Sequence, residues 1–393
     1  MTLQGRFREI KDSLAHHFTV KPEFLDGLIL AMLTREHAIL LGPPGTAKSA
    51  TVRALTSHFA DADYFESLLH KDLPDSAVLG PYDLPLLTSE GKYVRRTEGY
   101  LPTAHVAFLD EAFKASATLQ NALLAALNER VLHEVRDGRS AQPIPLHSAF
   151  AASNEGWQAL GEESRAFWDR MLFRFHVAPV NSARDFQRML GTPATYTPAA
   201  NALLSMADLD RACAEVDRVL VPDSTLAALF QLRSLLMKSE FGRHVSPRRW
   251  RKAVHVLQAQ AWRSGFESTD QLDRTAYMCL TPLLWDDPKH VSAVVSVIRN
   301  FIDLEFQDLA GPTVELRQMA EWVAGQIDAN PSTFSGEDQA RALDISRRLT
   351  RLLEDVQEIR GKEKGPGPRS VRIDALLQEI ATARADVRKL VAL

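Results

Sequence analysis

Two residues with the chemistry to handle a phosphate group, Lys48 and Ser49, stand at the end of a loop rich in glycine and proline. The loop, residues 42–49 (GPPGTAKS), follows the apolar run 37–41 and precedes a stretch with a helical pattern. A phosphate needs inward-pointing backbone N–H groups, a helix amino end, a mobile cation and a hydroxyl for Mg²⁺. We therefore predict a nucleotide phosphate site formed by Gly42, Pro43, Pro44, Gly45, Thr46, Ala47, Lys48, Ser49 and Ala50.

Two adjacent acids, Asp110 and Glu111, end another apolar run, about sixty residues after the loop. We predict that Lys48 reaches the β- and γ-phosphates and that Ser49 and Asp110 hold Mg²⁺, Asp110 through water. Glu111 would orient the attacking water, because phosphoryl transfer depends mostly on positioning and charge stabilisation. This pair of motifs predicts ATP as the substrate and Mg²⁺ as the cofactor.

A neutral amide, Asn154, follows a third apolar run, residues 149–152. At the carboxyl edge of a strand beside Asp110, its side chain could hydrogen-bond the γ-phosphate or the water. An asparagine that forms a turn is the alternative at this position.

Apolar runs of strand length alternate with helical patterns in the first half of the chain. The strand-like runs are 37–41, 106–109, 149–152 and 171–175, and helical spacing covers 22–34 and 119–127. Such alternation predicts a parallel sheet with helices on both faces. After about residue 185 only helical patterns remain.

A heptad-like spacing marks the C-terminal region on both sides of the breaker 361–370 (GKEKGPGPRS). This pattern predicts either an antiparallel helical hairpin or two amphipathic helices packed on the body of the protein. The repeating residues are Ile345, Leu349, Leu352, Val356 and Ile359, then Ile373, Leu376, Ile380, Ala383, Val387 and Leu390.

The composition excludes several classes of protein. A formal net charge of −4 gives no global attraction to nucleic acid or to an anionic membrane. Two cysteines, Cys213 and Cys279, cannot build a disulfide framework. No apolar run approaches 18 residues, so we expect no membrane span and a cytoplasmic location. Asp286 and Asp287 are expected to begin a helix.

Taken together, these motifs resemble the AAA+ superfamily, and within it the MoxR branch, particularly the RavA-like ATPases. GPPGTAKS is the MoxR form of the loop, with alanine at Ala47 before the lysine. FLDEAFKA (108–115), LLAALNERV (123–131) and AASNE (151–155) resemble the acid-ending strand, its following helix and the sensor-1 segment. Residues 78–102 look like the helix-2 insert, a hairpin that commonly faces the pore of the ring.

The resemblance implies a role for several further residues. Asn154 takes the sensor-1 role. Residues 169–174 (DRMLFR) resemble the segment of trans-acting arginines, with Arg170 as the first candidate for the arginine finger and Arg174 as the second. Residues 245–250 (VSPRRW) resemble the sensor-2 segment, in which Arg248, or else Arg249, leans from the helical lid onto the phosphates.

The resemblance also implies an architecture and an activity. We expect an AAA+ α/β nucleotide-binding domain over residues 1–190, an all-α lid over 191–295 and a C-terminal helical hairpin domain over 296–393. Subunits would form a ring, hexameric as in the family, that couples ATP hydrolysis to chaperone-like remodelling or maturation of a partner. A protein with a von Willebrand factor A (vWA) domain is the expected partner. A nucleotide-controlled scaffold and a DNA-acting motor are the alternatives, although the acidic balance disfavours nucleic acid.

Overall fold

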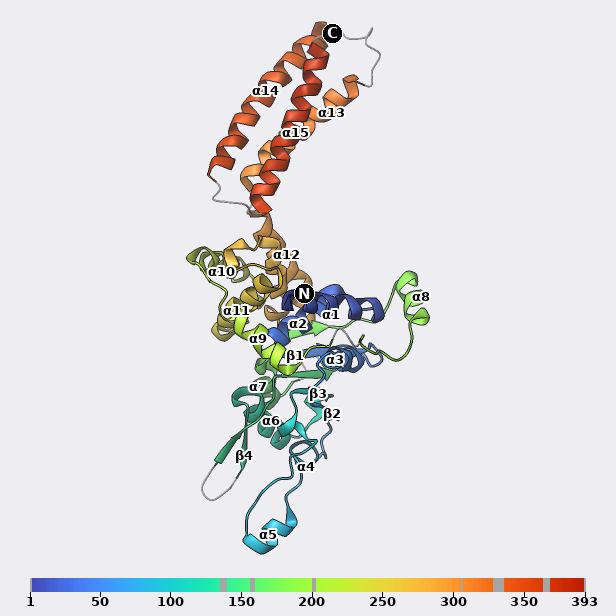
Figure 1. Ribbon diagram of the computed structural model, residues 1–393. Helices are drawn as coiled ribbons and strands as arrows, with labels where there is room; N and C mark the ends of the chain where they lie inside the picture. Colours follow the sequence, from blue (N-terminus) through green and yellow to red (C-terminus); the bar gives the residue numbers. More distant parts are fainter. Residues whose placement is uncertain are drawn as a thin grey trace. The chain divides into compact units, whose positions relative to one another are not determined.

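The computed structural model describes residues 2–134, 140–155, 160–199, 203–304, 307–327, 336–362 and 368–391. The chain divides into two compact units. Unit 1 comprises residues 1–270 and 276–296, and unit 2 comprises residues 271–275 and 297–393. Figure 1 shows the helices and strands of both units.

Unit 1 is built on a parallel sheet with the strand order β2-β3-β6-β1-β7. This finding confirms the predicted fold class. The strands are β1 (His37–Leu41), β2 (Tyr64–Leu68), β3 (Val106–Asp110), β6 (Ser148–Ser153) and β7 (Met171–His176). The strands β1, β3 and β6 are buried nearly throughout, which explains their continuous apolar runs. The edge strand β2 carries the mixed sequence YFESL and was not predicted, because its exposed positions hide the pattern.

Helices cover this sheet and connect its strands. α2 packs against β1 and β7, where Gly27 lies so close to the Phe175 ring that an added Cβ would be 2.2 Å from it. α3 packs against β3 and β6. The helices of this region are α1 (Leu3–His17), α2 (Pro22–Leu33), α3 (Lys48–Thr56), α4 (Ser76–Leu79), α5 (Leu84–Glu90), α6 (Ala117–Glu129), α7 (Glu162–Arg170) and α8 (Ala183–Gly191). Two further strands, β4 (Val131–Glu134) and β5 (Ser140–Pro143), pair antiparallel.

The segment predicted as the helix-2 insert projects from the sheet and carries α5 at its tip (Figure 1). Its two arms meet in an antiparallel bridge between Tyr82 and Arg95. The Arg95 guanidinium lies 2.6 Å from the carboxylate of Asp75 and 4.3 Å from the centre of the Tyr82 ring. These contacts fix the base of the insert, while Leu84 at its tip is 66% exposed.

After α8 come α9 (Met206–Val216), α10 (Asp223–Leu236), α11 (Pro247–Arg263) and α12 (Val291–Asp303). α9 and α11 pack against α2, and α11 also packs against α1. α11 begins with Pro247 after the capping residue Ser246, whose hydroxyl accepts a hydrogen bond from the Arg249 N–H group. The Phe7 ring of α1 meets the Trp262 ring edge-on at 5.8 Å, so the N-terminal helices join the sheet to the later helices.

Unit 2 has its own apolar core, formed between α13 (Gln307–Ile327), α14 (Gly336–Gly361) and α15 (Pro368–Val391). α14 and α15 pack against each other, and α13 packs against both. The predicted heptad positions of α14 and α15 line this core, with Ile359 partly buried against it. The core residues are Leu316, Met319, Val323, Ile345, Leu349, Leu352, Val356, Ile373, Leu376, Ile380, Ala383, Val387 and Leu390. Within the described residues, no helix has the length and apolarity needed to cross a bilayer.

Two buried histidines stabilise the amino edge of the sheet in unit 1. The Nε2 atom of His37 bonds to the Leu127 carbonyl at 2.7 Å, and its Nδ1 accepts from the Ala149 N–H group at 2.9 Å. His147 bonds to the Met32 carbonyl at 2.7 Å. Burial lowers the pKa of His37 from 6.5 to about 3 and that of His147 to about 4. Both rings are therefore neutral in the folded protein at neutral pH.

We expect the free energy of unfolding to fall as the pH is lowered from 7 to 5. With both pKa values depressed in the folded state, the unfolded chain binds more protons in this range, so stability present above pH 6.5 is lost below it. Each histidine contributes a slope of up to about 1.4 kcal/mol per pH unit. Urea unfolding at a series of pH values measures this slope. The slope should flatten in His37→Gln and in His147→Gln. An unchanged slope in both variants would show that these two histidines do not cause the pH dependence of stability.

Candidate active site

The backbone of the loop 42–49, here named the phosphate loop, leaves donors free at the start of α3. Ala47 is the N-cap residue, in the left-handed conformation with φ of 59°, and no side chain caps the helix. Gly45 has φ of 78°, and a Cβ added there would meet no atom within 4 Å. A Cβ on Gly42, by contrast, would be 2.2 Å from the Val177 carbonyl oxygen. Gly42 therefore allows close packing against β7, and Gly45 leaves open space above the loop.

Lys48 is folded back over the phosphate loop. Its ammonium group donates to the carbonyl oxygens of Gly42 and Pro43, both at 2.8 Å. Burial lowers the pKa of Lys48, and the charges of Asp110 and Glu111 act in the opposite direction. The lysine thus shares one electrostatic environment with both acids, and its loop carbonyl contacts can be exchanged for a phosphate.

The two acids lie where β3 ends. The Asp110 carboxylate accepts a hydrogen bond from the Glu111 N–H group at 2.9 Å. Glu111 has φ of 51°, a strained conformation that costs of order 1–2 kcal/mol for a residue with a Cβ. Its buried Oε2 atom has no hydrogen-bond partner, and the Lys114 ammonium lies 3.4 Å away. A buried carboxylate oxygen without a donor is costly, and it is suited to accept a bond from a water molecule.

Asn154 follows β6, and β6 lies between β3 and β1 in the sheet. The Gly42 N–H group donates to the Ser153 carbonyl at 3.1 Å, which ties the end of β6 to the phosphate loop. The sheet order therefore brings the segment of Asn154 between the acids and the loop, at one edge.

The residues at this carboxyl edge fit a nucleotide phosphate with Mg²⁺. The start of α3 offers uncapped N–H groups, Gly45 leaves room, and Lys48 supplies a cation. The hydroxyl of Ser49 and the carboxylate of Asp110 are the oxygen ligands that Mg²⁺ prefers.

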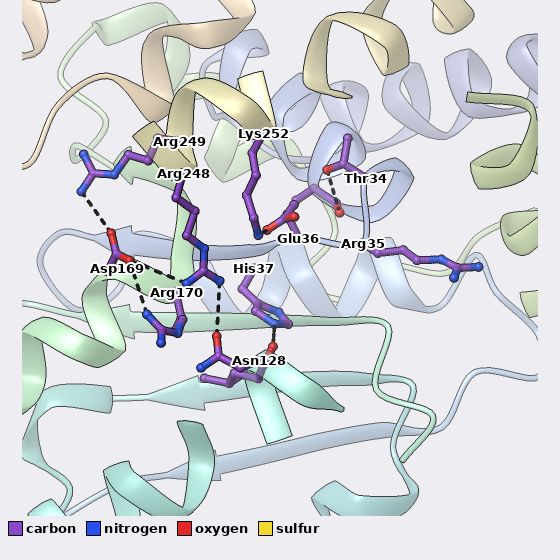
Figure 2. A network of polar contacts seen from close by, with 12 residues as sticks. Thr34, Arg35, Glu36, His37, Asn128, Asp169, Arg170, Arg248, Arg249 and Lys252 are labelled. Carbon is purple, nitrogen blue, oxygen red and sulfur yellow. Dashed lines mark hydrogen bonds and ion pairs between the residues drawn. The ribbon is translucent and has the colours of Figure 1, made fainter. Parts of the chain in front are cut away.

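The first candidate arginines lie at the opposite, amino edge of the sheet (Figure 2). Arg170 ends α7, directly before β7, and its guanidinium is 3.4 Å from the carboxylate of Asp169. Arg248, at the start of α11, donates to the Asn128 side chain at 3.3 Å and lies 3.8 Å from Asp169. Arg249, which follows Arg248 in α11, lies 4.0 Å from the same carboxylate, so Asp169 is within 4 Å of three arginines from two helices (Figure 2).

The two edges are separated by the length of the strands. The five residues of β1 pair in parallel with β7, from His37 at the level of Met171 to Leu41 at the level of His176. At a rise of about 3.3 Å per residue, the arginines lie on the order of 16 Å from the phosphate loop of their own chain. The family resemblance implied that Arg248 leans onto these phosphates. Within one chain it does not, because it lies at the opposite edge of the sheet. Both arginines face away from the loop side.

The two alternative arginines are buried and hold the fold together. Arg174 has a fully enclosed side chain that bonds to the carbonyls of Trp285 and Trp168, both at 3.3 Å. Arg249 is 5% exposed and binds the Asp286 carboxylate at 2.5 Å. Arg174 lies 3.8 Å from the same carboxylate. Burial lowers the pKa of Arg174 to about 9, so it remains charged at neutral pH.

The sequence assigns Asp169 no role of its own and predicts only a helix start for Asp286. Asp287 caps the turn before α12, as expected, but Asp286 points inward and accepts from Trp168 at 3.0 Å as well as from Arg249. Burial alone would raise the pKa of Asp286, and Arg174 and Arg249 hold it below its ordinary value. Asp286 is 37 positions from Arg249 and more than a hundred from Trp168 and Arg174, so no local pattern could reveal these contacts.

Two known protein families match separate stretches of this chain. Residues 5–206, just over half of the chain, match the family described as the MoxR domain in the MoxR–vWA–β-propeller ternary systems. Residues 224–298 match the AAA lid domain.

An uncharacterised protein of Methanocaldococcus jannaschii is 30% identical over 90% of this chain and 91% of its own length. The chaperone MoxR1 of Mycobacterium tuberculosis is 27% identical over 48% of each chain. A crystal structure from Cytophaga hutchinsonii, provisionally named an ATPase, aligns with a TM-score of 0.58 and 16% identity, covering 77% of this chain and 94% of that one. The chain belongs to the MoxR family of AAA+ ATPases.

Proposed function

We propose that this protein hydrolyses ATP in a closed head-to-tail ring, with each site formed by two subunits. One subunit supplies the phosphate loop and the acids, and the next supplies Arg170 and Arg248. The proposal is supported by the separation of these groups at opposite edges of one sheet, because neither arginine can reach the loop of its own chain. A heterologous contact joins unlike faces of two copies, and it forms a ring when the rotation between successive copies closes. Six subunits are the expectation from the family resemblance.

Within one subunit, the residues of the carboxyl edge bind and orient. Lys48 exchanges its loop carbonyls for phosphate oxygens. Ser49 and, through water, Asp110 would hold Mg²⁺, which when bound would supply positive charge beside the phosphates. The Glu111 carboxylate, with one buried oxygen lacking a donor, orients water for in-line attack. Asn154 would hydrogen-bond the γ-phosphate or that water.

From the neighbouring subunit, the two surface arginines stabilise negative charge on the transferring phosphoryl group. Arg170 is the finger and Arg248 is the sensor-2 residue, both acting in trans. Arg174 and Arg249 are excluded from this role by their burial around Asp286. The hydrolysis step therefore depends on assembly.

The output that we propose is remodelling or maturation of a protein partner. The matching family description places its MoxR domains in systems with a vWA protein, and a vWA partner is our proposal for this chain as well. The exposed tip of the insert, with Leu84 66% and Tyr93 51% exposed, offers an apolar contact to a substrate chain. We further propose a RavA-like place within the family, from the motifs of the phosphate loop and acids, and a cytoplasmic location.

The shared site predicts complementation between two inactive variants. Glu111→Gln keeps its arginines, and Arg170→Ala or Arg248→Ala keeps the loop and acids, so each alone should lose ATPase activity, by about 10³-fold for the finger. In an equal mixture, about a quarter of the sites combine an intact Glu111 with an intact neighbouring arginine. Phosphate release should therefore recover to about a quarter of the wild-type rate.

The control mixes Glu111→Gln with Lys48→Ala, whose lesions both lie at the carboxyl edge and cannot complement. Recovered ATPase activity in this control mixture would contradict the shared site. So would the absence of recovered activity in the mixtures of Glu111→Gln with an arginine variant. A Glu111→Gln protein that binds ATP and still supports the full biological output would instead indicate a scaffold.

The partner proposal predicts a nucleotide-dependent complex. Glu111→Gln with ATP should hold the partner and co-purify with a vWA protein, whereas Lys48→Ala should not. Mass spectrometry of the purified complexes identifies the partner. Capture that is equal in both variants, or a Glu111→Gln complex that lacks any vWA protein, would overturn this assignment.

A further inference from the structure

Helix α8 carries an apolar face that the described part of the chain leaves exposed. Phe186, Met189 and Leu190 are spaced by three and four residues, which aligns them on one side of the helix. They are 50%, 42% and 67% exposed, and none of the residues of α8 is buried. Burying a side chain of this kind contributes about 1.5–3 kcal/mol, so such a face favours a partner surface.

Polar contacts, rather than apolar packing, hold α8 in place. The Arg188 guanidinium donates to the carbonyl oxygens of Ala15, His16 and Phe18 at the end of α1. Ser182 caps the helix by accepting from the Asp185 N–H group at 3.0 Å. The helix is thus anchored through its polar side. It follows the carboxyl end of β7, on the side of unit 1 where α3 and the phosphate loop lie (Figure 1).

A second exposed apolar face lies on α10. Leu226 and Phe230, one turn apart, are 46% and 66% exposed, and Met237 just past the helix is 37% exposed. The helix packs into the lid through other residues, which are Thr225, Leu229, Leu232 and Leu236. The residues of the exposed face therefore do not contribute to the apolar core of the lid.

The two faces lie on opposite sides of unit 1. In Figure 1, α8 and α3 lie on one side, and α10, α11 and α7 lie on the other. α10 leads through one short turn, Phe241–His244, into α11, which carries Arg248 at its start. The α8 face thus lies on the same side of unit 1 as the phosphate loop, and the α10 face lies on the same side as the arginines.

We propose that the α8 face of one subunit packs on the α10 face of the next, beside the shared ATP site. This inference rests on the proposed head-to-tail ring. That ring brings the loop side of one copy against the arginine side of another, so a single repeated contact covers both faces. Self-pairing of α8 in a two-fold dimer would leave α10 uncovered. A second copy of this chain is therefore the occupant that accounts for both surfaces together.

Charge substitution at both faces tests this contact. Leu190→Asp and Phe230→Lys should each raise the protein concentration needed for assembly at least about tenfold. Each substitution places an unpaired charge in the contact between two subunits, where it would be buried. The double variant, in which the two charges meet across the interface, should recover much of the assembly. Light scattering with ATP measures assembly, and a fluorescent ATP analogue and thermal unfolding check that the subunits stay folded and bind nucleotide.

The matched control is Leu343→Asp, the same change at a leucine of α14 that is 45% exposed, and it should assemble normally. If Leu190→Asp assembles like the wild type, the α8 contact is wrong and the ring proposal stands. If both single variants fail and the double variant does not recover, the two faces do not meet. If the wild type remains monomeric with ATP, the ring and this contact both fall.

Discussion

Strand direction is the constraint on which the rest of this structure depends. All five strands of the sheet run parallel, so the segments that leave them gather at one edge and the segments that enter them gather at the other. Lys48, Glu111 and Asn154 follow strand ends, and Arg170 precedes a strand start. A strand of about 16 Å separates the two sets. In the proposed ring, the carboxyl edge of one sheet and the amino edge of the next would together supply all of these groups.

Buried ion pairing at the amino edge decides which arginines are available to a neighbour. Asp286 takes Arg174 and Arg249 into the interior, where removing one partner of a buried pair costs about 3–5 kcal/mol. Asp169 lies within 4 Å of Arg170, Arg248 and Arg249, and of these Arg170 and Arg248 keep exposed fractions of 26% and 40%. The four arginines thus divide into two that are buried beside Asp286 and two that stay partly exposed at the amino edge.

The motifs predicted where the candidate residues of the carboxyl edge lie, because each one follows the end of an apolar strand within a few residues and local order fixes its place. The buried strands and the heptads of α14 and α15 were predictable for the same reason. The edge strand β2 has no such pattern. The pairings of Asp286 and the side of the sheet reached by Arg248 depend on contacts between segments that are far apart in the sequence, from 37 residues for Arg249 and Asp286 to 120 for Arg248 and Asn128. Spacing along the chain carries no information about them.

A structure of the Glu111→Gln assembly with ATP and Mg²⁺ would test the central claim most directly. The account predicts that each nucleotide contacts Lys48 and Ser49 of one subunit and Arg170 and Arg248 of its neighbour, with Arg174 still buried beside Asp286. A nucleotide contacted by Arg248 of the same chain that supplies Lys48 would contradict it.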